Sequence, residues 1–410
     1  MKFAQIIVFL LMPFSLLADE SYDLFDLSLY ELTKLEISTS SIIYEPVDES
    51  VVPITIIGAQ TIANSGAQTL KDLLIRYVPG MTNVQDQNEI NIAMRGIFTS
   101  SQQKILILLD GHRLNSHVYS MAAPDFGIAL NQIKQIEIMR GPGSSVYGDV
   151  ALTAVVNIIL RSAKDKELFK SSVTLGNYRQ QQFNIDWSKK FKNADLMTWI
   201  QHYQNEGQPF TTQPEEAFNR IPIKKPTKSY INRFSDDPAI DAGLKINFGD
   251  WLAFINYSRS HYVEPFSTGQ ISGEAYSYHD YDKLDGSTPG LQSTSWHSNI
   301  QHNHSLSPDF IWINELSYDQ LSIDSALVTN PAENRFGIAK FSDKAYGFKS
   351  QLIYKSNANQ IILGYQFKQF KLDDSQFLVG QNNLVTGEVS FNGNALVNPG
   401  EESSQALFAM

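Results

Sequence analysis

The sequence contains no cysteine, which excludes disulfides, thiolate metal sites and a cysteine nucleophile. It also lacks a dense run of lysine and arginine, and its net charge of −11 argues against the basic footprint of a nucleic-acid-binding protein. Beyond the N-terminus no stretch approaches 18 uninterrupted apolar residues, which excludes helical membrane spans. Strands that cross a membrane need no such run, and a chain that is 42% hydrophobic but only 18% charged is compatible with them.

The first residues have the pattern of a secretory signal peptide. Lys2 precedes an apolar run from Ile6 to Leu17, and Ala18 is followed at once by Asp19. A transmembrane anchor is the alternative, but the run is shorter than the roughly 20 residues that a spanning helix needs. We expect cleavage after Ala18, and therefore export by a bacterial route.

Residues 47–163 have the pattern of a compact α/β domain. Short apolar strands are predicted at Lys104 to Leu109 and at Ile133 to Met139, among turn signals. One helix is predicted from Thr69 to Arg76, because its leucines have helical spacing, Thr69 can cap it and Pro79-Gly80 ends it.

Residues 164–410 instead alternate apolar and polar positions, as in Phe183, Ile185 and Trp187, which is the pattern of strands with one apolar face. Ten segments follow this pattern. They start near Phe169, Gln181, Ala194, Ala239, Trp251, Ser295, Phe310, Ala345, Gln360 and Ser404. Four short turns (189–193, 249–250, 305–309, 356–359) alternate with four long polar loops (207–238, 263–294, 322–343, 372–402), as in outer-membrane barrels.

A soluble β-sandwich would also alternate apolar and polar positions. The regular rhythm of short and long connections favours the barrel, and so do aromatic residues that the sequence places near strand ends, as in an interfacial girdle. These residues are Tyr178, Trp187, Trp199, Tyr203, Trp251, Tyr257, Trp296 and Trp312.

Four segments of the α/β domain resemble the plug of the TonB-dependent outer-membrane receptor family. The first runs from Pro53 to Met81, and the second is Ile92-Ala93-Met94-Arg95-Gly96. The third is Ile107-Leu108-Leu109-Asp110-Gly111, where Gly111 allows a positive φ and Asp110 can bond the turn backbone. The fourth and longest runs from Ile136 through Gly148 to Ile159, with the spacing of the family throughout.

The resemblance implies a plug in the lumen of a transmembrane barrel, and it assigns motif positions. These are Pro79, Gly80, Gly96, Asp110, Gly111, Gly141, Pro142, Gly143, Tyr147, Gly148 and Asn157. It also implies that Arg95 and Arg140 face the barrel wall and pair with carboxylates there, although ordinary surface arginines would look the same in the sequence.

Residues 19–46 form an N-terminal periplasmic segment in this interpretation. Leu35, Glu36, Ile37, Ser38 and Thr39 lie where the family keeps its TonB box, which pairs as an added strand with its periplasmic partner. A plain linker is the alternative. The implied partners are the TonB, ExbB and ExbD complex, outer-membrane lipid and a small-molecule or metal-chelate ligand.

No catalytic set, cofactor or bound metal is expected, because the eight histidines are scattered. Only His302 and His304 are close in sequence; they could suit a metal or line a polar barrel wall. The ligand should touch the plug apex and the outer loops. Candidate contacts are Arg113, Asn115, His117 and Tyr119 on the plug, and Tyr276, Tyr278, His279 and Tyr281 in a loop.

The expected function is energised uptake of a scarce ligand such as a ferric siderophore or cobalamin. A non-transporting binding or structural fragment is an alternative, and a passive porin, which would lack a plug, is another. Plugged outer-membrane transporters have about 22 strands, and residues 164–410 are too few for that number with its connections. We therefore expect a chain that ends before the barrel closes, in which Arg95 and Arg140 lack their usual partners.

Overall fold

The computed structural model describes residues 36–37, 45–46, 52–86, 89–99, 103–148, 150–163, 168–212, 227–231, 233–234, 237–263, 266–268, 274–356, 360–389 and 399–409. The predicted signal peptide, residues 1–18, lies outside these ranges. No helix within them is long and apolar enough to span a membrane.

The N-terminal part contains a five-stranded mixed sheet. Its order is β3-β8-β9-β6-β7, in which β6 and β9 are parallel and the other pairs are antiparallel. The strands are β3 Ile54–Gly58, β6 Ile105–Leu109, β7 His112–Arg113, β8 Ile133–Met139 and β9 Ala154–Leu160. The predicted α/β character of this part is thus confirmed, and β6 and β8 coincide with the two strands predicted from apolar runs.

The predicted helix is confirmed as α3, Leu70–Tyr77. The Asp72 backbone N–H donates to Thr69 Oγ1 (3.2 Å), and the Thr69 N–H donates to Asp72 Oδ2 (3.1 Å). This reciprocal pair satisfies two donors that the first helical turn would otherwise leave unpaired. Two shorter helices, α2 Ala59–Asn64 and α4 Ser144–Tyr147, complete this part.

The core of this part lies between the mixed sheet and α3. Leu70, Leu73 and Leu74 of α3 pack with Ile105, Ile107 and Leu109 of β6 in one buried cluster. The other face of the sheet, with Leu106 and Leu108, packs on Val150 and Ala151. Every residue of β6 is buried, which explains its continuous apolar sequence.

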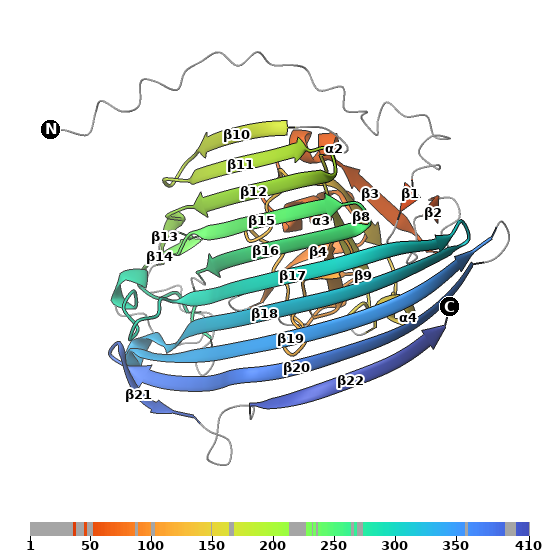
Figure 1. Ribbon diagram of the computed structural model, residues 1–410. Helices are drawn as coiled ribbons and strands as arrows, with labels where there is room; N and C mark the ends of the chain where they lie inside the picture. The colour runs from red at the N-terminus through yellow and green to blue at the C-terminus, as the bar shows by residue number, and fades with distance from the viewer. Residues whose placement is uncertain are drawn as a thin grey trace.

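The C-terminal part is a sheet of eleven strands that curves around the first part (Figure 1). Its neighbouring strands are antiparallel throughout. They are β10 Leu168–Leu175, β11 Gln181–Lys190, β12 Ala194–Gln204, β15 Ala239–Phe248, β16 Trp251–Tyr262, β17 Gly290–Ser307, β18 Phe310–Asn330, β19 Arg335–Lys355, β20 Gln360–Gln381, β21 Leu384–Glu388 and β22 Gly400–Ala409. All ten predicted segments lie in this sheet.

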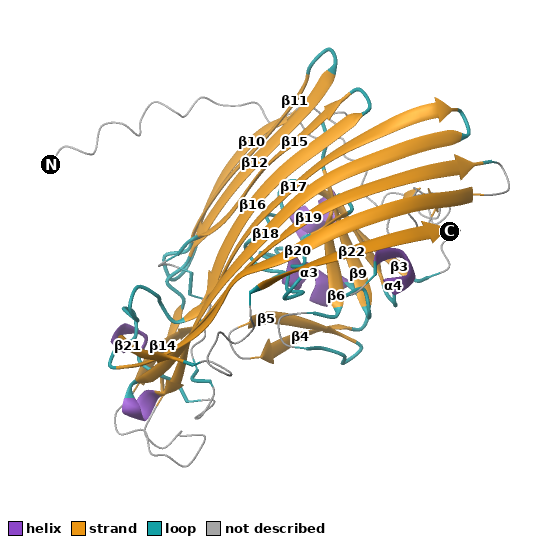
Figure 2. Cartoon of the chain, turned by 60° about the horizontal axis from the view of Figure 1, so that its bottom comes forward, coloured by secondary structure: helices purple, strands orange, loops and turns teal. Residues whose placement is uncertain are grey.

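The predicted loop lengths were partly wrong. β18, β19 and β20 have 21, 21 and 22 residues, so most of the two loops predicted at 322–343 and 372–402 is strand where the structure describes it. Figure 2 shows β18, β19 and β20 among the long strands of the sheet. A membrane crossing takes about ten residues, so each of the three is longer than one crossing requires. The polar residues in their outer halves resemble loops in the sequence, but the backbones stay paired, as Asp324 with Lys340 shows.

Smaller elements lie around these two parts. They are the two-stranded pairs β1 Glu36–Ile37 with β2 Glu45–Pro46, β4 Met81–Asp86 with β5 Glu89–Met94, and β13 Gln208–Thr212 with β14 Thr227–Ile231, and the 3₁₀ turns η4 Tyr278–Asp280 and η5 Pro331–Glu333.

The eleven-stranded sheet is open in the described residues. β10 lies at one end of the strand order, and β20 carries both β21 and β22 at the other. Figure 1 shows the two ends apart. That the chain ends before a barrel of about 22 strands closes stays a prediction.

Candidate functional site at the plug–barrel interface

The turn between β6 and β7 joins the two parts of the molecule. Gly111 has φ 83° and Asp110 has φ 49°, so the positive φ predicted for Gly111 is confirmed. Asp110 was predicted to bond the backbone of its own turn, but the Gly111 N–H donates to Asn157 Oδ1 (3.0 Å). Asp110 instead accepts from the Leu160 N–H (2.9 Å) and from Lys245 Nζ on β15 (2.6 Å). Both charged side chains are only 10% exposed, so they form a buried ion pair across the interface.

Asp241, four residues before Lys245 on β15, is a second anchor between the two parts. Its carboxylate accepts from the Ala129 N–H (2.7 Å) and from Gln132 Nε2 (3.2 Å), both in the loop before β8. It also accepts from Trp199 Nε1 (3.1 Å) and Asn256 Nδ2 (2.6 Å) of the neighbouring strands. These four donors satisfy the hydrogen-bonding capacity of the buried carboxylate.

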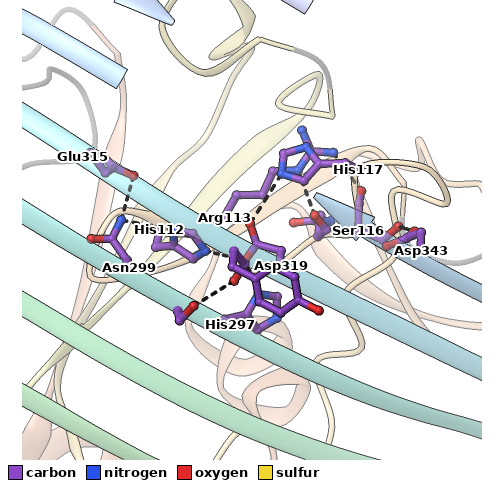
Figure 3. Close-up of polar contacts among 12 residues, drawn as sticks. His112, Arg113, Ser116, His117, His297, Asn299, Glu315, Asp319 and Asp343 are labelled. Atoms are coloured by element: carbon purple, nitrogen blue, oxygen red, sulfur yellow. Dashed lines mark hydrogen bonds and ion pairs between the residues drawn. The ribbon is translucent and has the colours of Figure 1, made fainter. Parts of the chain in front are cut away.

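Three histidines surround a third buried carboxylate, that of Asp319 on β18. His112 of β7 places Nε2 2.6 Å from Asp319 Oδ1. His297 of β17 places Nδ1 2.8 Å from the same oxygen, because the strand register sets these two residues opposite each other. His117, in the loop after β7, has Nε2 3.8 Å from Oδ2. Figure 3 shows these side chains converging on Asp319.

The two histidines of the N-terminal part titrate in opposite directions. Burial lowers the pKa of His117 to about 4, so its imidazole is neutral near pH 7. Burial also acts to lower the pKa of His112, but the adjacent Asp319 carboxylate outweighs it and raises the pKa above the ordinary value. His112 therefore favours the charged form that Asp319 stabilises.

A cavity of about 570 Å³ adjoins this cluster between the β6–β7 turn and strands β18, β19 and β20. Its charged and polar lining includes Arg113, His117, Glu315, Asp319, Lys349, Gln366 and Lys368. Charges of both signs face it, so it suits a ligand with several polar groups.

The four plug residues predicted to contact a ligand do not share one role. Arg113 and His117 line the cavity, although the Arg113 guanidinium also donates to the carbonyls of Asn115 and Ser116 (2.9 Å each). Asn115 is 1% exposed and links its loop to Ile105 and Ile107 of β6. Tyr119 stacks on Phe341 of β19, with ring centroids 5.4 Å apart.

The four loop residues predicted as their partners lie elsewhere. Tyr276 and Tyr281 are buried in a cluster with Phe336 and Ile338, at the outer ends of the long strands. Tyr278 is buried under the Arg233 guanidinium (4.3 Å), whereas His279 is exposed. None of the four lines the cavity, so the structure does not bring the two predicted sets together.

The comparison that decides the family concerns the N-terminal part. Residues 46–155 match the family described as TonB-dependent Receptor Plug Domain. The chain carries the plug domain of the TonB-dependent receptor family. Its five-stranded sheet is the plug, and its eleven-stranded sheet is barrel wall.

Relatives of the receptor match it across both parts. The Vitamin B12 transporter BtuB of Vibrio vulnificus (strain CMCP6) is 24% identical over 348 residues, which are 84% of this chain and 51% of the relative. Among solved structures, the unliganded ferric citrate transporter FecA has a TM-score of 0.60 at 13% identity. The match covers 88% of this chain and 53% of the FecA chain. A mutant of the ferric enterobactin receptor PfeA of Pseudomonas aeruginosa has a TM-score of 0.58 at 14% identity, and the match covers 88% of this chain and 55% of the PfeA chain. The chain thus spans about half the length of these relatives.

The relatives are outer-membrane receptors, and the eleven-stranded sheet of this chain curves around the plug as their barrel walls do. Its outward face carries exposed apolar residues, among them Ile200, Ile255, Ile300, Leu316 and Leu363. Part of the predicted aromatic girdle was wrong. Trp251 and Trp312 are exposed near the short turns, but Trp199 and Tyr203 are buried against the plug. Trp199 faces inward because Gly243, its partner on β15, leaves room for the indole ring.

Arg95 and Arg140 lie close together on the plug. Arg95 Nη2 donates to the Arg140 carbonyl (3.4 Å), and Arg95 is exposed. Arg140 Nε is buried and has no hydrogen-bond partner among the residues that the structure describes. Within the residues that the structure describes, neither guanidinium bonds a carboxylate. The pairing that the family resemblance implies is therefore not seen among them.

The remaining predicted positions are partly described. Within the TonB box, Glu36 and Ile37 form β1 and pair antiparallel with Glu45–Pro46, whereas Leu35, Ser38 and Thr39 lie outside the described residues. Among the motif glycines, Gly80, Gly96 and Gly148 have positive φ like Gly111. Gly143 has none, but a Cβ there would overlap Val155 and Met139.

The sequence interpretation missed the residues that carry the interface charges: His112, Asp241, Lys245, His297 and Asp319. The signal that could have found some of them is the strand alternation, which places Asp241 and Lys245 on one face of β15. Alternation shows only that a polar residue points into the lumen. Its contact with the plug depends on the tertiary structure.

Proposed function

We propose that this receptor takes up a scarce ligand across the outer membrane with energy from the TonB, ExbB and ExbD complex. The observation that carries the proposal is the plug itself, seated against the barrel wall through the buried pair Asp110–Lys245 and the bonds of Asp241 and Asp319. A plug held in this way opposes passive diffusion, so passage of a ligand requires work on the plug. Transport rather than catalysis is the role, and a passive porin would have no use for such contacts.

We further propose a ferric siderophore, cobalamin or a similar chelate as the ligand. The similar proteins are a vitamin B12 transporter, a ferric citrate transporter and a ferric enterobactin receptor, which supports this class without selecting a member. Arg113 and His117 are the proposed plug contacts, because they line the 570 Å³ cavity. Tyr119 and His279 stay candidate contacts in this proposal, whereas the burial of Asn115, Tyr276, Tyr278 and Tyr281 makes them structural supports.

The proposed division of the chain places the periplasmic segment at residues 19–46, the plug at 47–163 and the barrel strands at 164–410. The TonB box is proposed at Leu35 to Thr39. The pairing of β1 with β2 supports this, because a box binds its partner as an added strand and Glu36–Ile37 already has extended backbone.

An uptake assay tests the function. Cells that produce the full receptor are given labelled cyanocobalamin, ferric citrate or ferric enterobactin, with TonB present or deleted. We expect accumulation of at least one ligand only with TonB. Equal accumulation in both strains would instead indicate a passive pore, and surface binding without accumulation would indicate a binding protein that does not transport.

A further inference from the structure

Two groups of side chains in the described residues have donor atoms close enough to share one metal ion. They are His112, His297 and Asp319 at the plug–barrel interface, and Asp250, His302 and His304 at a short turn. In each group the donor atoms lie within 4.8 Å of one another. All three residues of the first group are buried, whereas Asp250 and His304 of the second are exposed. The interface group is therefore the more preorganised of the two.

We propose that His112, His297 and Asp319 bind a divalent transition-metal ion that ties the plug to the barrel wall. Two imidazole nitrogens and one carboxylate oxygen suit Zn²⁺ and its neighbours Co²⁺, Ni²⁺ and Cu²⁺. Ca²⁺ and Mg²⁺ are disfavoured, because they require mostly oxygen ligands. The site goes beyond the proposed uptake function and does not depend on the identity of the transported ligand.

The side of the cluster that faces the cavity supplies the fourth position and an entry path. His117 Nε2 lies 3.8 Å from the second oxygen of Asp319, within reach of a small side-chain movement. The 570 Å³ cavity is lined by His112, His117 and Asp319, so an ion or a metal-bound water can reach the cluster from it. Three protein ligands plus one open position is a recurrent arrangement for zinc.

Asn299 provides an outer partner for His112, the plug histidine of the proposed site. Its Nδ2 donates to Glu315 Oε1 (2.7 Å) and lies 3.5 Å from His112 Nδ1. Its Oδ1 is buried without a partner among the described residues. A His112 bound to metal through Nε2 carries its proton on Nδ1, and Asn299 can accept that proton through Oδ1 once its amide rotates away from Glu315.

The three ligands come from both parts of the receptor, which gives the ion a mechanical role. His112 belongs to β7 of the plug, 207 positions before Asp319 in the chain, whereas His297 and Asp319 are opposite residues on two barrel strands. An ion held by all three must be released before β7 can move away from the wall. The same residues can form hydrogen bonds without metal, and the experiment is designed to distinguish these two states.

The test measures Zn²⁺ binding to the full chain, purified in detergent and stripped with EDTA. A His302→Ala/His304→Ala parent removes the exposed group, and calorimetry on it should give one Zn²⁺ per chain. His297→Ala and Asp319→Asn, each added to this parent, should weaken binding by more than the roughly 10- to 100-fold that loss of an outer partner costs. His261→Ala is the matched control. It removes another buried histidine, whose carboxylate partner is Asp237, and it should leave Zn²⁺ affinity unchanged.

Two further readouts separate metal binding from a folding defect. Co²⁺ should give the visible absorption of a low-symmetry nitrogen–oxygen site in the parent and lose it in Asp319→Asn, which retains the shape of the side chain. Zn²⁺ should slow amide hydrogen exchange in β7 of the parent but not of His297→Ala. Unchanged Zn²⁺ affinity in both single variants, or no binding to the parent, would overturn the proposal.

Discussion

At the scale of single residues, the charges between plug and wall are buried and paired. The ion pair of Asp110 and Lys245 is the clearest case, because each side chain is 10% exposed and their atoms are 2.6 Å apart. An unpaired charge at this depth is costly, whereas removal of both charges together costs much less. The contribution of the pair is therefore best measured with single and double variants.

Asp110→Asn or Lys245→Met alone should destabilise the docked plug by about 3 kcal/mol, since each leaves a buried charge unpaired. Asp110→Asn keeps an oxygen for the Leu160 N–H, so the loss reports the charge. The double variant should lose less stability than the sum of the losses in the two single variants. Urea titrations of hydrogen exchange at the Leu160 amide measure these free energies, and strictly additive losses would contradict a direct coupling.

Two glycines of one motif should differ sharply when they are replaced by alanine. A Cβ at Gly143 would overlap Val155 and Met139, whereas a Cβ at Gly141 meets nothing within 4 Å. Gly143→Ala should cost about 1–3 kcal/mol through overpacking, and Gly141→Ala should be close to neutral. Chemical unfolding of the plug checks both, with Gly141→Ala as the matched control. Equal losses would show that the steric argument is wrong.

At the scale of elements, local interactions set the plug helix, whereas pairing sets the barrel strands. The capping box of Thr69 and Asp72 belongs wholly to α3 and its first turn. The long strands have no comparable local signal. Their outer halves mix polar and apolar residues, and they remain strand because each has a partner on either side, as β19 has between β18 and β20.

Thr69→Ala should lower the stability of the plug by about 1 kcal/mol, because the Asp72 N–H loses its acceptor. Thr69→Ser keeps the hydroxyl and should restore most of the loss. The comparison uses the midpoint of plug unfolding in urea. If Ser were as damaging as Ala, the methyl group of this buried residue rather than its hydroxyl would be responsible.

At the scale of the whole molecule, the barrel wall has two different faces. Its outward face is apolar, with residues such as Ile300 and Leu316 paired across β17 and β18. Its inward face carries Asp241, Lys245, His297 and Asp319 toward the plug. A polar inner face allows a plug to be held by hydrogen bonds and ion pairs.

Deletion of Leu35 to Ser40 should abolish energised uptake and leave ligand binding at the outer face unchanged, because the segment acts only through its periplasmic partner. Labelled cyanocobalamin or ferric citrate, whichever the intact receptor accumulates, measures both quantities. Deletion of an equal length between Asp19 and Tyr30 serves as the control and should retain uptake. Uptake by the receptor without residues 35–40 would move the TonB box elsewhere, with Ser41 to Tyr44 the next segment to delete.

The sequence by itself determined the resemblance to the plug family, the plug strands β6 and β8, the helix α3 and the ten segments of barrel strand. These features depend on signals within a few residues of one another, such as apolar alternation, a capping threonine and glycines in turns. Only the tertiary structure decided which inward residues meet the plug and how far the strands extend. The partners in these contacts are far apart in the chain, 135 positions for Asp110 and Lys245 and 207 for His112 and Asp319. Strand register and sheet curvature bring them together, and neither can be read from the pattern of one segment.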